Sequence, residues 1–249
     1  MSGPIRRRAV LCELHAHSTW SDGALSLREL VDLYGRAGFD VPCVTDHALR
    51  SDDPWFAEQR ARDGRGVVDA GNFDAYLAAI DLEAERAVAR YGMLVVPGLE
   101  LTYNDLDPNK AAHAVAVGLR AFVPLDTGIL DALHAAREAG AALIAAHPHG
   151  EQPDMIPRNT TRHFWREWSR FAPLLDRVEL FNQTNLFGWV ASQHVPVVAS
   201  GDFHSLEHLA SWKTLLPCLQ TERAVVDYLR SPPPAHLLPF RAETAEQAA

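Results

Sequence analysis

Residues 10–23 read VLCELHAHSTWSDG, and this stretch decides the fold. Val10–Leu14 has the length and the largely apolar character of a buried β-strand. His15 and His17 follow it at once, and Asp22 comes a few residues later, before a glycine. A strand that ends in such residues places them at one edge of a sheet, where α/β proteins bind their ligands.

The same arrangement recurs along the chain, because short apolar runs alternate with helical segments. This alternation indicates a parallel α/β fold. The first helix begins at Ser26, where Glu29 completes a capping box, and further helices are expected near 72–90, 127–139, 162–171 and from Thr221. Seven main strands are predicted, with a strand-like Leu215–Leu219 after them: Val10–Leu14, Phe39–Val44, Met93–Leu99, His113–Val117, Ala142–Ala146, Val178–Phe181 and Val195–Ala199.

A chain of 249 residues suits one large domain better than two small ones. We expect a single catalytic domain over residues 1–231 and a loosely ordered tail over 232–249, which opens with prolines and ends in small polar residues. Residues 48–71 are polar with little periodicity and predict a long loop.

Charge and hydrophobicity exclude some classes of function. The net charge of −9 argues against a protein that coats long nucleic acids. No apolar run approaches the ~18 residues of a membrane span, and no apolar segment follows Arg6–Arg8, so we expect a cytoplasmic protein. Cys12, Cys43 and Cys218 form no close pair and are expected to be buried free thiols.

Histidines and carboxylates stand at or near the ends of most predicted strands. Because the carboxyl ends of parallel strands meet on one side of such a fold, these residues should converge. Imidazole and carboxylate groups are the ligands of zinc, manganese and iron. The sequence therefore predicts a metal site built from His15, His17, Asp22, His47, Glu100, His113, His147, Asp202 and His204.

The order of these motifs resembles that of the PHP (polymerase and histidinol phosphatase) superfamily. The matching blocks are H-A-H, S-D-G, T-D-H, P-G-L-E, a strand histidine, A-H-P and G-D-F-H, spread from Cys12 to His204. The resemblance implies a distorted, seven-stranded (β/α)7 TIM-like barrel that binds two to three divalent ions, a trinuclear metal centre when all are bound.

The resemblance also implies how the ligands divide. One ion would be held by His15, His17, Glu100 and Asp202, and a second would share Glu100 and add His113 and His147. A third would take Asp22, His47 and His204. Many relatives have histidine where this chain has Asp22, and the harder oxygen ligand favours manganese or iron over zinc.

Such a centre would hydrolyse a phosphate ester with a metal-activated hydroxide between the two ions that share Glu100. We expect Glu100, Asp202, His204 and His149 to act in catalysis, with His149 a candidate proton donor to the leaving group. Asp46 is expected to orient a ligand imidazole and Asn182 to support the site by hydrogen bonding. Substrate phosphate is expected to contact Arg50, Lys110 and Arg158, which lie in predicted loops.

The substrate class that we favour is a small phosphomonoester, either histidinol phosphate or a nucleotide-derived phosphate. A competing reading is an amidohydrolase-like enzyme that cuts C–N or C–O bonds. Those barrels often use a bridging lysine, and neither Lys110 nor Lys213 follows a strand in the required place. A nuclease for short oligonucleotides and a non-catalytic metal protein also stay open. No membrane partner is expected, and the sequence leaves the oligomeric state open.

Overall fold

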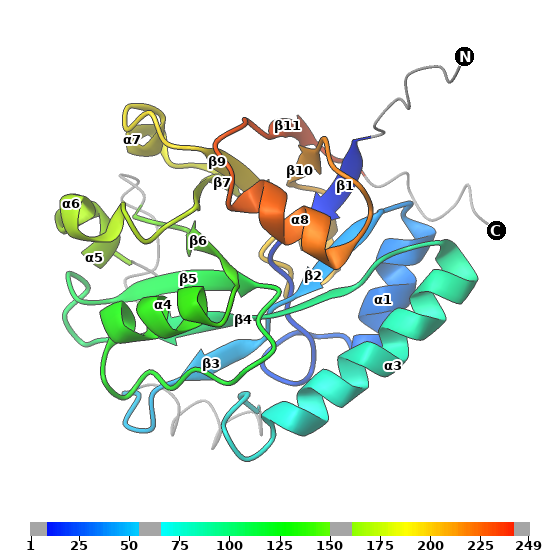
Figure 1. The fold of residues 1–249 in the computed structure, drawn as a ribbon, viewed down its shortest axis with the longest axis horizontal. Helices are drawn as coiled ribbons and strands as arrows, with labels where there is room; N and C mark the ends of the chain where they lie inside the picture. Colours follow the sequence, from blue (N-terminus) through cyan, green and yellow to red (C-terminus); the bar gives the residue numbers. More distant parts are fainter. Residues whose placement is uncertain (1–8, 55–65, 150–160, 242–249) are drawn as a thin grey trace.

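The computed structural model describes residues 9–54, 66–149 and 161–241. Their strands form one strongly curled sheet in the order β11-β10-β1-β2-β4-β5-β6-β7-β8, in which β3 pairs with β4 and β9 with β7 (Figure 1). The strands are β1 (Val10–Glu13), β2 (Val41–Val44), β3 (His47–Leu49), β4 (Val96–Tyr103), β5 (Ala112–Val117), β6 (Ala142–Ala146), β7 (Arg177–Asn182), β8 (Asn185–Leu186), β9 (Val197–Ser200), β10 (Trp212–Leu216) and β11 (His236–Pro239).

Helices cover the outside of this curl. α1 (Leu27–Arg36) and α3 (Phe73–Tyr91) pack side by side (Figure 1), joined by an ion pair of 2.6 Å between Arg86 Nη1 and Asp32 Oδ1. The remaining helices are α4 (Ile129–Glu138), α5 (His163–Arg166), α6 (Trp168–Phe171), α7 (Gly188–Ala191), the 3-10 helix η2 (Leu206–Leu209) and α8 (Glu222–Leu229). None of the helices in the described segments is both long and apolar enough to cross a membrane.

The core has two layers, because successive side chains of a strand point to opposite faces. The outer layer lies between sheet and helices and joins strand residues such as Leu101 to helix residues such as Tyr76. The inner layer fills the curl with β-branched residues and includes Val225 and Leu229 of α8. Cys12, Cys43 and Cys218 are buried in this inner layer and form no disulfide with one another, as predicted.

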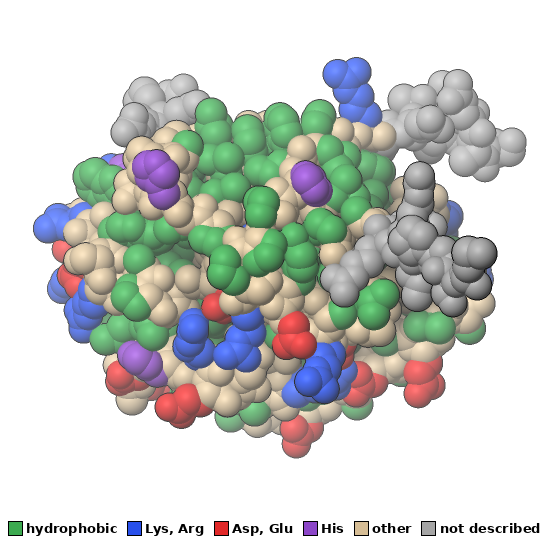
Figure 2. Space-filling model, turned by 45° about the horizontal axis from the view of Figure 1, so that its top comes forward, with side chains coloured by type: hydrophobic (Ala, Val, Ile, Leu, Met, Phe, Trp, Pro, Cys, Tyr) green, Lys and Arg blue, Asp and Glu red, His purple; other side chains and the backbone are tan. Residues whose placement is uncertain are grey.

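On the surface shown in Figure 2, hydrophobic side chains gather on the upper part and acidic and basic side chains intermix below. Some surface charges pair with one another: Arg120 Nη2, for example, lies 2.8 Å from Glu222 Oε2. The hydrophobic side chains most exposed among the described residues include Leu106 and Leu206.

The seven-strand (β/α)7 arrangement is not confirmed, although the mixed α/β class is. The described residues form 11 strands, and β5 runs antiparallel to both β4 and β6. The tail prediction is wrong for β11, which pairs with β10 from Trp212–Pro239 to Leu215–His236. The loop predicted over residues 48–71 begins later than expected, because β3 extends to Leu49, and residues 55–65 of it lie outside the described part of the chain.

Candidate metal centre

Six strands and the segments that follow them bring the predicted ligands together. His15 and His17 follow β1, and Asp22 lies in the loop before α1. His47 begins β3, and its Cα pairs with that of Glu100 on β4. His147 follows β6, while Asp202 and His204 follow β9.

His113 reaches the same place by a different route. It lies at the amino end of β5, where it pairs with Thr102 of β4 and Ala146 of β6. Because β5 runs opposite to its neighbours, its beginning meets their carboxyl ends. The expectation of a histidine at this edge was therefore right, although the direction of its strand was not.

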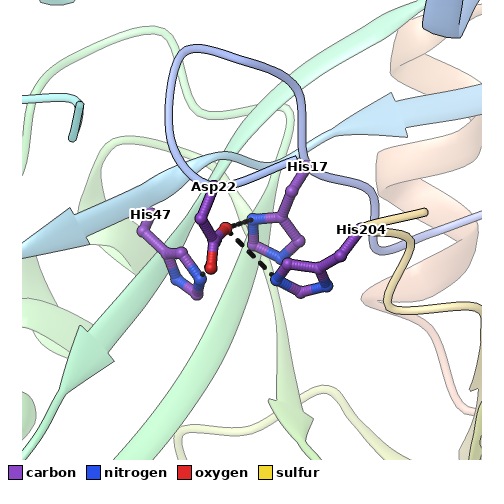
Figure 3. A group of neighbouring side chains, drawn as sticks. All are labelled: His17, Asp22, His47 and His204. Atoms are coloured by element: carbon purple, nitrogen blue, oxygen red, sulfur yellow. Dashed lines mark ion pairs between the residues drawn. The ribbon is translucent and has the colours of Figure 1, made fainter. Parts of the chain in front are cut away.

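The nine side chains form three groups whose candidate ligand atoms lie within 4.8 Å of one another. One group contains His17, Asp22, His47 and His204 (Figure 3). A second contains His15, His17 and Asp202, and a third contains Glu100, His113 and His147. The resemblance implies a similar division, with two differences: His17 also joins the Asp22 group, and Glu100 groups with His113 and His147 but not with His15, His17 and Asp202.

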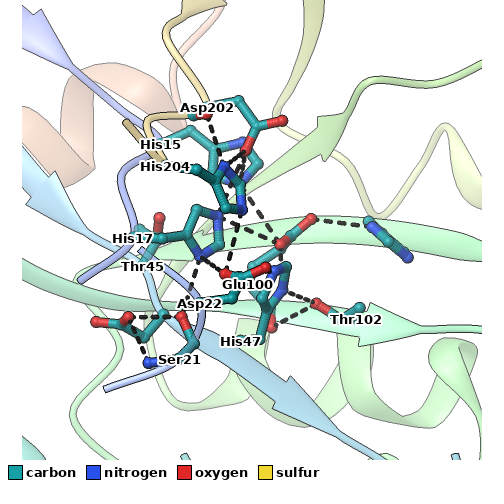
Figure 4. Close-up of polar contacts among 12 residues, drawn as sticks. His15, His17, Ser21, Asp22, Thr45, His47, Glu100, Thr102, Asp202 and His204 are labelled. Atoms are coloured by element: carbon teal, nitrogen blue, oxygen red, sulfur yellow. Dashed lines mark hydrogen bonds and ion pairs between the residues drawn. The ribbon is translucent and has the colours of Figure 1, made fainter. Parts of the chain in front are cut away.

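Glu100 is fully buried at the centre of the cluster (Figure 4). Its Oε1 lies 3.1 Å from His113 Nδ1 and 3.2 Å from His147 Nε2. Its Oε2 lies 3.5 Å from His15 Nε2, 3.6 Å from His17 Nε2 and 2.6 Å from His47 Nδ1. The two oxygens of one carboxylate thus face two different sets of imidazoles, which is the arrangement of a bridging ligand.

Several of these atoms are buried with no hydrogen bond to any described residue. They are His15 Nε2, His17 Nε2, Asp22 Oδ1, Glu100 Oε2 and His113 Nδ1. Their close polar neighbours are other atoms of the same cluster, as in the 2.6 Å contact of Glu100 Oε2 with His47 Nδ1. A buried polar atom without a hydrogen bond is costly, so a group of them directed at a common centre needs an explanation. Nitrogen and carboxylate donors in this number and spacing fit divalent transition-metal ions.

The close packing of imidazoles and carboxylates shifts their pKa values. Burial disfavours the imidazolium of His15, but the carboxylates of Asp202 and Glu100 outweigh this and hold its pKa well above the usual range. Burial also opposes protonation of His204, but the carboxylates of Asp202 and Asp22 favour it. Their effect is the larger one, so the pKa of His204 rises to about 9. Burial, together with the neighbouring His204 and His47, lowers the pKa of His17 to about 3.

Asp46 supports the loop that carries Asp22. Its Oδ1 accepts hydrogen bonds from Ser18 N at 2.8 Å and Ser21 Oγ at 2.6 Å. Ser21 Oγ in turn lies 3.4 Å from His17 Nδ1. The sequence predicts that Asp46 orients a ligand imidazole, and in the structure Asp46 reaches His17 through Ser21.

Two buried glutamates were missed in the sequence, Glu13 on β1 and Glu179 on β7. Glu179 Oε1 lies 3.1 Å from His15 Nδ1, and Oε2 accepts a hydrogen bond of 2.8 Å from Asn182 Nδ2. Both glutamates stand inside apolar strand sequences. Glu13 lies two residues before His15, on the same face of an extended strand, and this spacing was the available signal. No proposed ligand lies close to Glu179 in the sequence, so no such signal pointed to it. Asn104 was also missed; its Oδ1 lies 2.9 Å from His113 Nε2.

The predicted substrate contacts are less closely tied to the cluster. Arg50 Nη1 donates to Tyr103 Oη at 2.9 Å, and Tyr103 packs against the outer core layer rather than the inner one. Lys110 is exposed, and Arg158 lies outside the described residues. His149 belongs to none of the three groups, and its ring lies 4.9 Å from that of Trp165.

Comparison with known proteins identifies the fold. No family model matches the sequence. The structure superimposes with a TM-score of 0.63 and 18% identity on a two-domain protein from Bacteroides vulgatus that contains a predicted PHP-like metal-dependent phosphoesterase. The match covers 93% of this chain and 65% of that one, so this chain spans less than two thirds of its relative.

Two further similarities are more limited. A segment of 36 residues is 47% identical to the DNA polymerase/3′-5′ exonuclease PolX of Bacillus subtilis (strain 168), and it covers 14% of this chain and 6% of PolX. An amidohydrolase from Chromobacterium violaceum, solved with sulfate and no metal, has a TM-score of 0.49 and 16% identity, with 78% of this chain and 87% of that one covered. Of these comparisons, the one with the Bacteroides vulgatus protein shows that this chain shares its fold with a protein that contains a predicted PHP-like phosphoesterase, as the resemblance implies.

Proposed function

We propose that this chain is a metal-dependent phosphoesterase. The observation that carries the proposal is the position of Glu100, whose two oxygens face separate sets of buried histidines. A fold shared with a protein that contains a PHP-like phosphoesterase supports the same activity. Three buried cysteines that form no disulfide with one another support a reducing, cytoplasmic setting.

We assign the nine clustered residues as ligands of two to three divalent ions, with manganese or iron favoured over zinc by Asp22. Such ions would lower the pKa of bound water and neutralise the charge of a phosphate ester. Through its two oxygens, Glu100 would be a ligand of two ions and would fix their positions relative to each other. Asp202 lies 3.3 Å from His15 Nε2 and 3.4 Å from His17 Nε2, close enough to share an ion with both.

Proton transfer to the leaving group needs a residue that is not fully committed to metal. His149 is our candidate, because it stands two residues beyond His147 and outside the ligand groups. His204 is the second candidate, since it lies in the most exposed of the three groups, with 26% of its side chain accessible. Lys110, Arg50 and Arg158 remain proposed contacts for the substrate phosphate.

The proposed substrate is a small phosphomonoester, either histidinol phosphate or a nucleotide-derived phosphate. A lysine-bridged amidohydrolase centre is disfavoured by the position of Lys213. Its Nζ is fully buried and donates to Glu13 Oε2 at 2.5 Å and to Ser211 Oγ at 2.7 Å, so it is engaged away from the ligand groups. We retain residues 1–231 as the proposed catalytic unit, extended by β11.

The test is phosphate release from a panel of esters by protein loaded separately with Mn²⁺, Fe²⁺ or Zn²⁺. The panel contains histidinol phosphate, nucleoside monophosphates, nucleotide bisphosphates and short oligonucleotides. We expect release from a monoester that is abolished by a chelator and by His113→Ala or Glu100→Gln. His134→Ala, which changes a histidine on α4 outside the ligand groups, should leave it unchanged.

Metal binding without release from any ester would overturn the phosphoesterase proposal and favour a C–N or C–O hydrolase or a non-catalytic metal protein. Full activity and metal content in Glu100→Gln would contradict the bridging role of this carboxylate.

A further inference from the structure

The candidate centre lies where the end of β1 meets the end of β9, a junction in the curled sheet that we call the seam. β1 forms ladders with β2 and β10, and β9 forms one with β7. In the described part of the chain, the backbone pairing that joins the ends of β1 and β9 is a single isolated bridge, Ala16 to Phe203. His15 and His17 follow β1 and Asp202 follows β9, so they come from the two sides of this seam. Figure 4 shows the side chains of His15 and Asp202 close together.

Glu13 ties the two sides of the seam together. This fully buried carboxylate accepts a hydrogen bond from His15 N at 3.2 Å and from Gly201 N at 2.7 Å, both through Oε1. Gly201 directly precedes Asp202 in the chain. Glu13 Oε1 therefore accepts from the backbone of the ligand His15 and from the backbone of Gly201, which is 188 residues away from Glu13 in the chain and adjacent to the ligand Asp202.

Lys213 of β10 balances the charge of this carboxylate. Its Nζ donates to Glu13 Oε2 at 2.5 Å, to Ser211 Oγ at 2.7 Å and to the His208 carbonyl at 3.3 Å, which uses all three donors of an ammonium group. Tyr34 Oη donates to the same Oε2 at 3.1 Å. The four hydrogen bonds that Glu13 accepts fill the capacity of a carboxylate.

A buried ion pair of this kind is a weak source of stability, because desolvation offsets most of the attraction. Its placement points instead to positioning. Asp202 adopts a left-handed backbone conformation with φ 45°, which is strained for a residue other than glycine and needs support from its surroundings. A Cβ at Gly201 would collide with Lys213 Nζ and Glu13 Oε2, so the pair fits closely against the backbone that holds Asp202.

We propose that Glu13 and Lys213 are a positioning pair that closes the seam and sets the separation of His15 and Asp202. The pair thereby sets the affinity of the His15–His17–Asp202 group for its divalent ion. The Glu100–His113–His147 group is carried by β4, β5 and the end of β6, away from the seam, and keeps its affinity without the pair. This inference rests on the proposed metal-binding function.

The test compares Mn²⁺ binding by the wild type and by Glu13→Gln/Lys213→Met, using equilibrium dialysis followed by elemental analysis. The double variant removes both charges, so no unpaired charge stays buried. We expect the affinity of one Mn²⁺ to fall about 10–100-fold, the range typical of residues that orient ligands, while another site keeps its affinity. Arg86→Met is the matched control, because it breaks an ion pair between α1 and α3 whose two residues belong to none of the ligand groups, and it should leave Mn²⁺ binding unchanged.

Unchanged Mn²⁺ affinities in the double variant, even with a lower melting temperature, would overturn the inference and leave the pair a structural role alone. An equal loss at every site would also overturn it. If the double variant does not fold, Tyr34→Phe decides: it removes one hydrogen bond to Glu13 and should cause a smaller loss at the same single site. A wild-type protein that binds no divalent ion would overturn the proposed function itself.

Discussion

Glu179 lies just outside the three ligand groups and contacts two of them. Its Oε1 faces His15 Nδ1 at 3.1 Å, and its Oε2 accepts a hydrogen bond of 2.6 Å from the backbone of His147. A carboxylate on the far nitrogen of a metal-binding imidazole fixes its tautomer and ring orientation and increases its basicity. Glu179 can therefore prepare His15 and His147 for binding without contacting an ion.

Glu179→Gln tests this role. The amide keeps the size of the side chain but offers one acceptor oxygen in place of two, so His15 loses its orientation or His147 N loses its partner. We expect a loss of about 10–100-fold in metal affinity or activity, measured by Mn²⁺ titration and ester hydrolysis. Glu167→Gln changes a glutamate with 45% of its side chain exposed and serves as control. Equal Mn²⁺ affinity in both variants would show that Glu179 does not orient the ligands.

The raised pKa values make metal binding depend on pH. In the metal-free protein the pKa of His204 is about 9, because Asp202 and Asp22 outweigh the effect of burial, so this imidazole is largely protonated at pH 7. A metal ion takes only the neutral imidazole, so binding at pH 7 should release about one proton or more, and affinity should rise as the pH approaches 9. His17, with a pKa of about 3, is already neutral and releases none.

Calorimetric titration with Mn²⁺ at pH 7 in two buffers of different ionisation enthalpy measures this release. Binding heats that are the same in both buffers would contradict the predicted proton release.

At the scale of residues, the sequence predicts the ligands better than the groups that support them. H-x-H and G-D-F-H stand directly after apolar runs, so the position of a strand end locates them. Glu13 and Glu179 lie within strands, and their partners Gly201 and His15 are 188 and 164 residues away. Only the folded sheet brings such partners together, and a single sequence does not show which residues far apart in the chain are in contact.

Among the elements, α1 shows how a local sequence motif determines a contact with a residue far away in the chain, here the contact of Tyr34 with Glu13. Ser26 Oγ accepts a hydrogen bond from Glu29 N at 3.3 Å, and Glu29 Oε2 accepts one from Ser26 N at 2.9 Å, which is the predicted capping box. The helix that starts there buries Leu30 and Tyr34 against the sheet, and Tyr34 reaches Glu13. A defined helix start thus fixes where the Tyr34 hydroxyl meets the seam.

Ser26→Ala should remove this cap at a cost of about 1 kcal/mol in the free energy of unfolding. For a chain of this size the melting temperature should fall by about 2–4 °C, as measured by calorimetry. Ser26→Asp, which can accept the same hydrogen bond, should retain most of the stability. A melting temperature that is unchanged in Ser26→Ala would show that the capping box contributes little to α1.

The direction of β5 could not be predicted from the apolar runs of the sequence, because such a run reads the same in a parallel and in an antiparallel strand. A link of residues 104–111 joins β4 to β5. A parallel crossover needs about a dozen residues or more, usually with a helix. The predicted strands end at Leu99 and begin again at His113, which leaves room for one, and only the extension of β4 to Tyr103 makes the link too short. β11 was missed because three prolines precede it and its pairing with β10 is not encoded in its own short sequence.

In the whole molecule, the nine proposed ligands come from both halves of the curled sheet. Those on β1, β3 and β4 and their loops meet others on β5, after β6 and after β9. Ions held by all of them would connect segments that the strand ladders leave joined at the seam by one bridge. The fold and the proposed ions should therefore stabilise each other, since the ligand groups exist together only in the folded chain.

Removal of metal should accordingly destabilise the entire domain. An ion present at 100 times its Kd adds about 2.7 kcal/mol to the free energy of unfolding. At about 2–4 °C per kcal/mol for this size of chain, loss of one ion should lower the melting temperature by roughly 5–10 °C. Calorimetry of the Mn²⁺-loaded protein before and after EDTA measures the change, and Mn²⁺ added in excess should restore the higher value. Glu100→Gln, which alters the carboxylate between two groups, should show a smaller difference between the two states. A melting temperature that does not respond to EDTA in the wild type would mean that the buried cluster does not hold ions that matter to the fold.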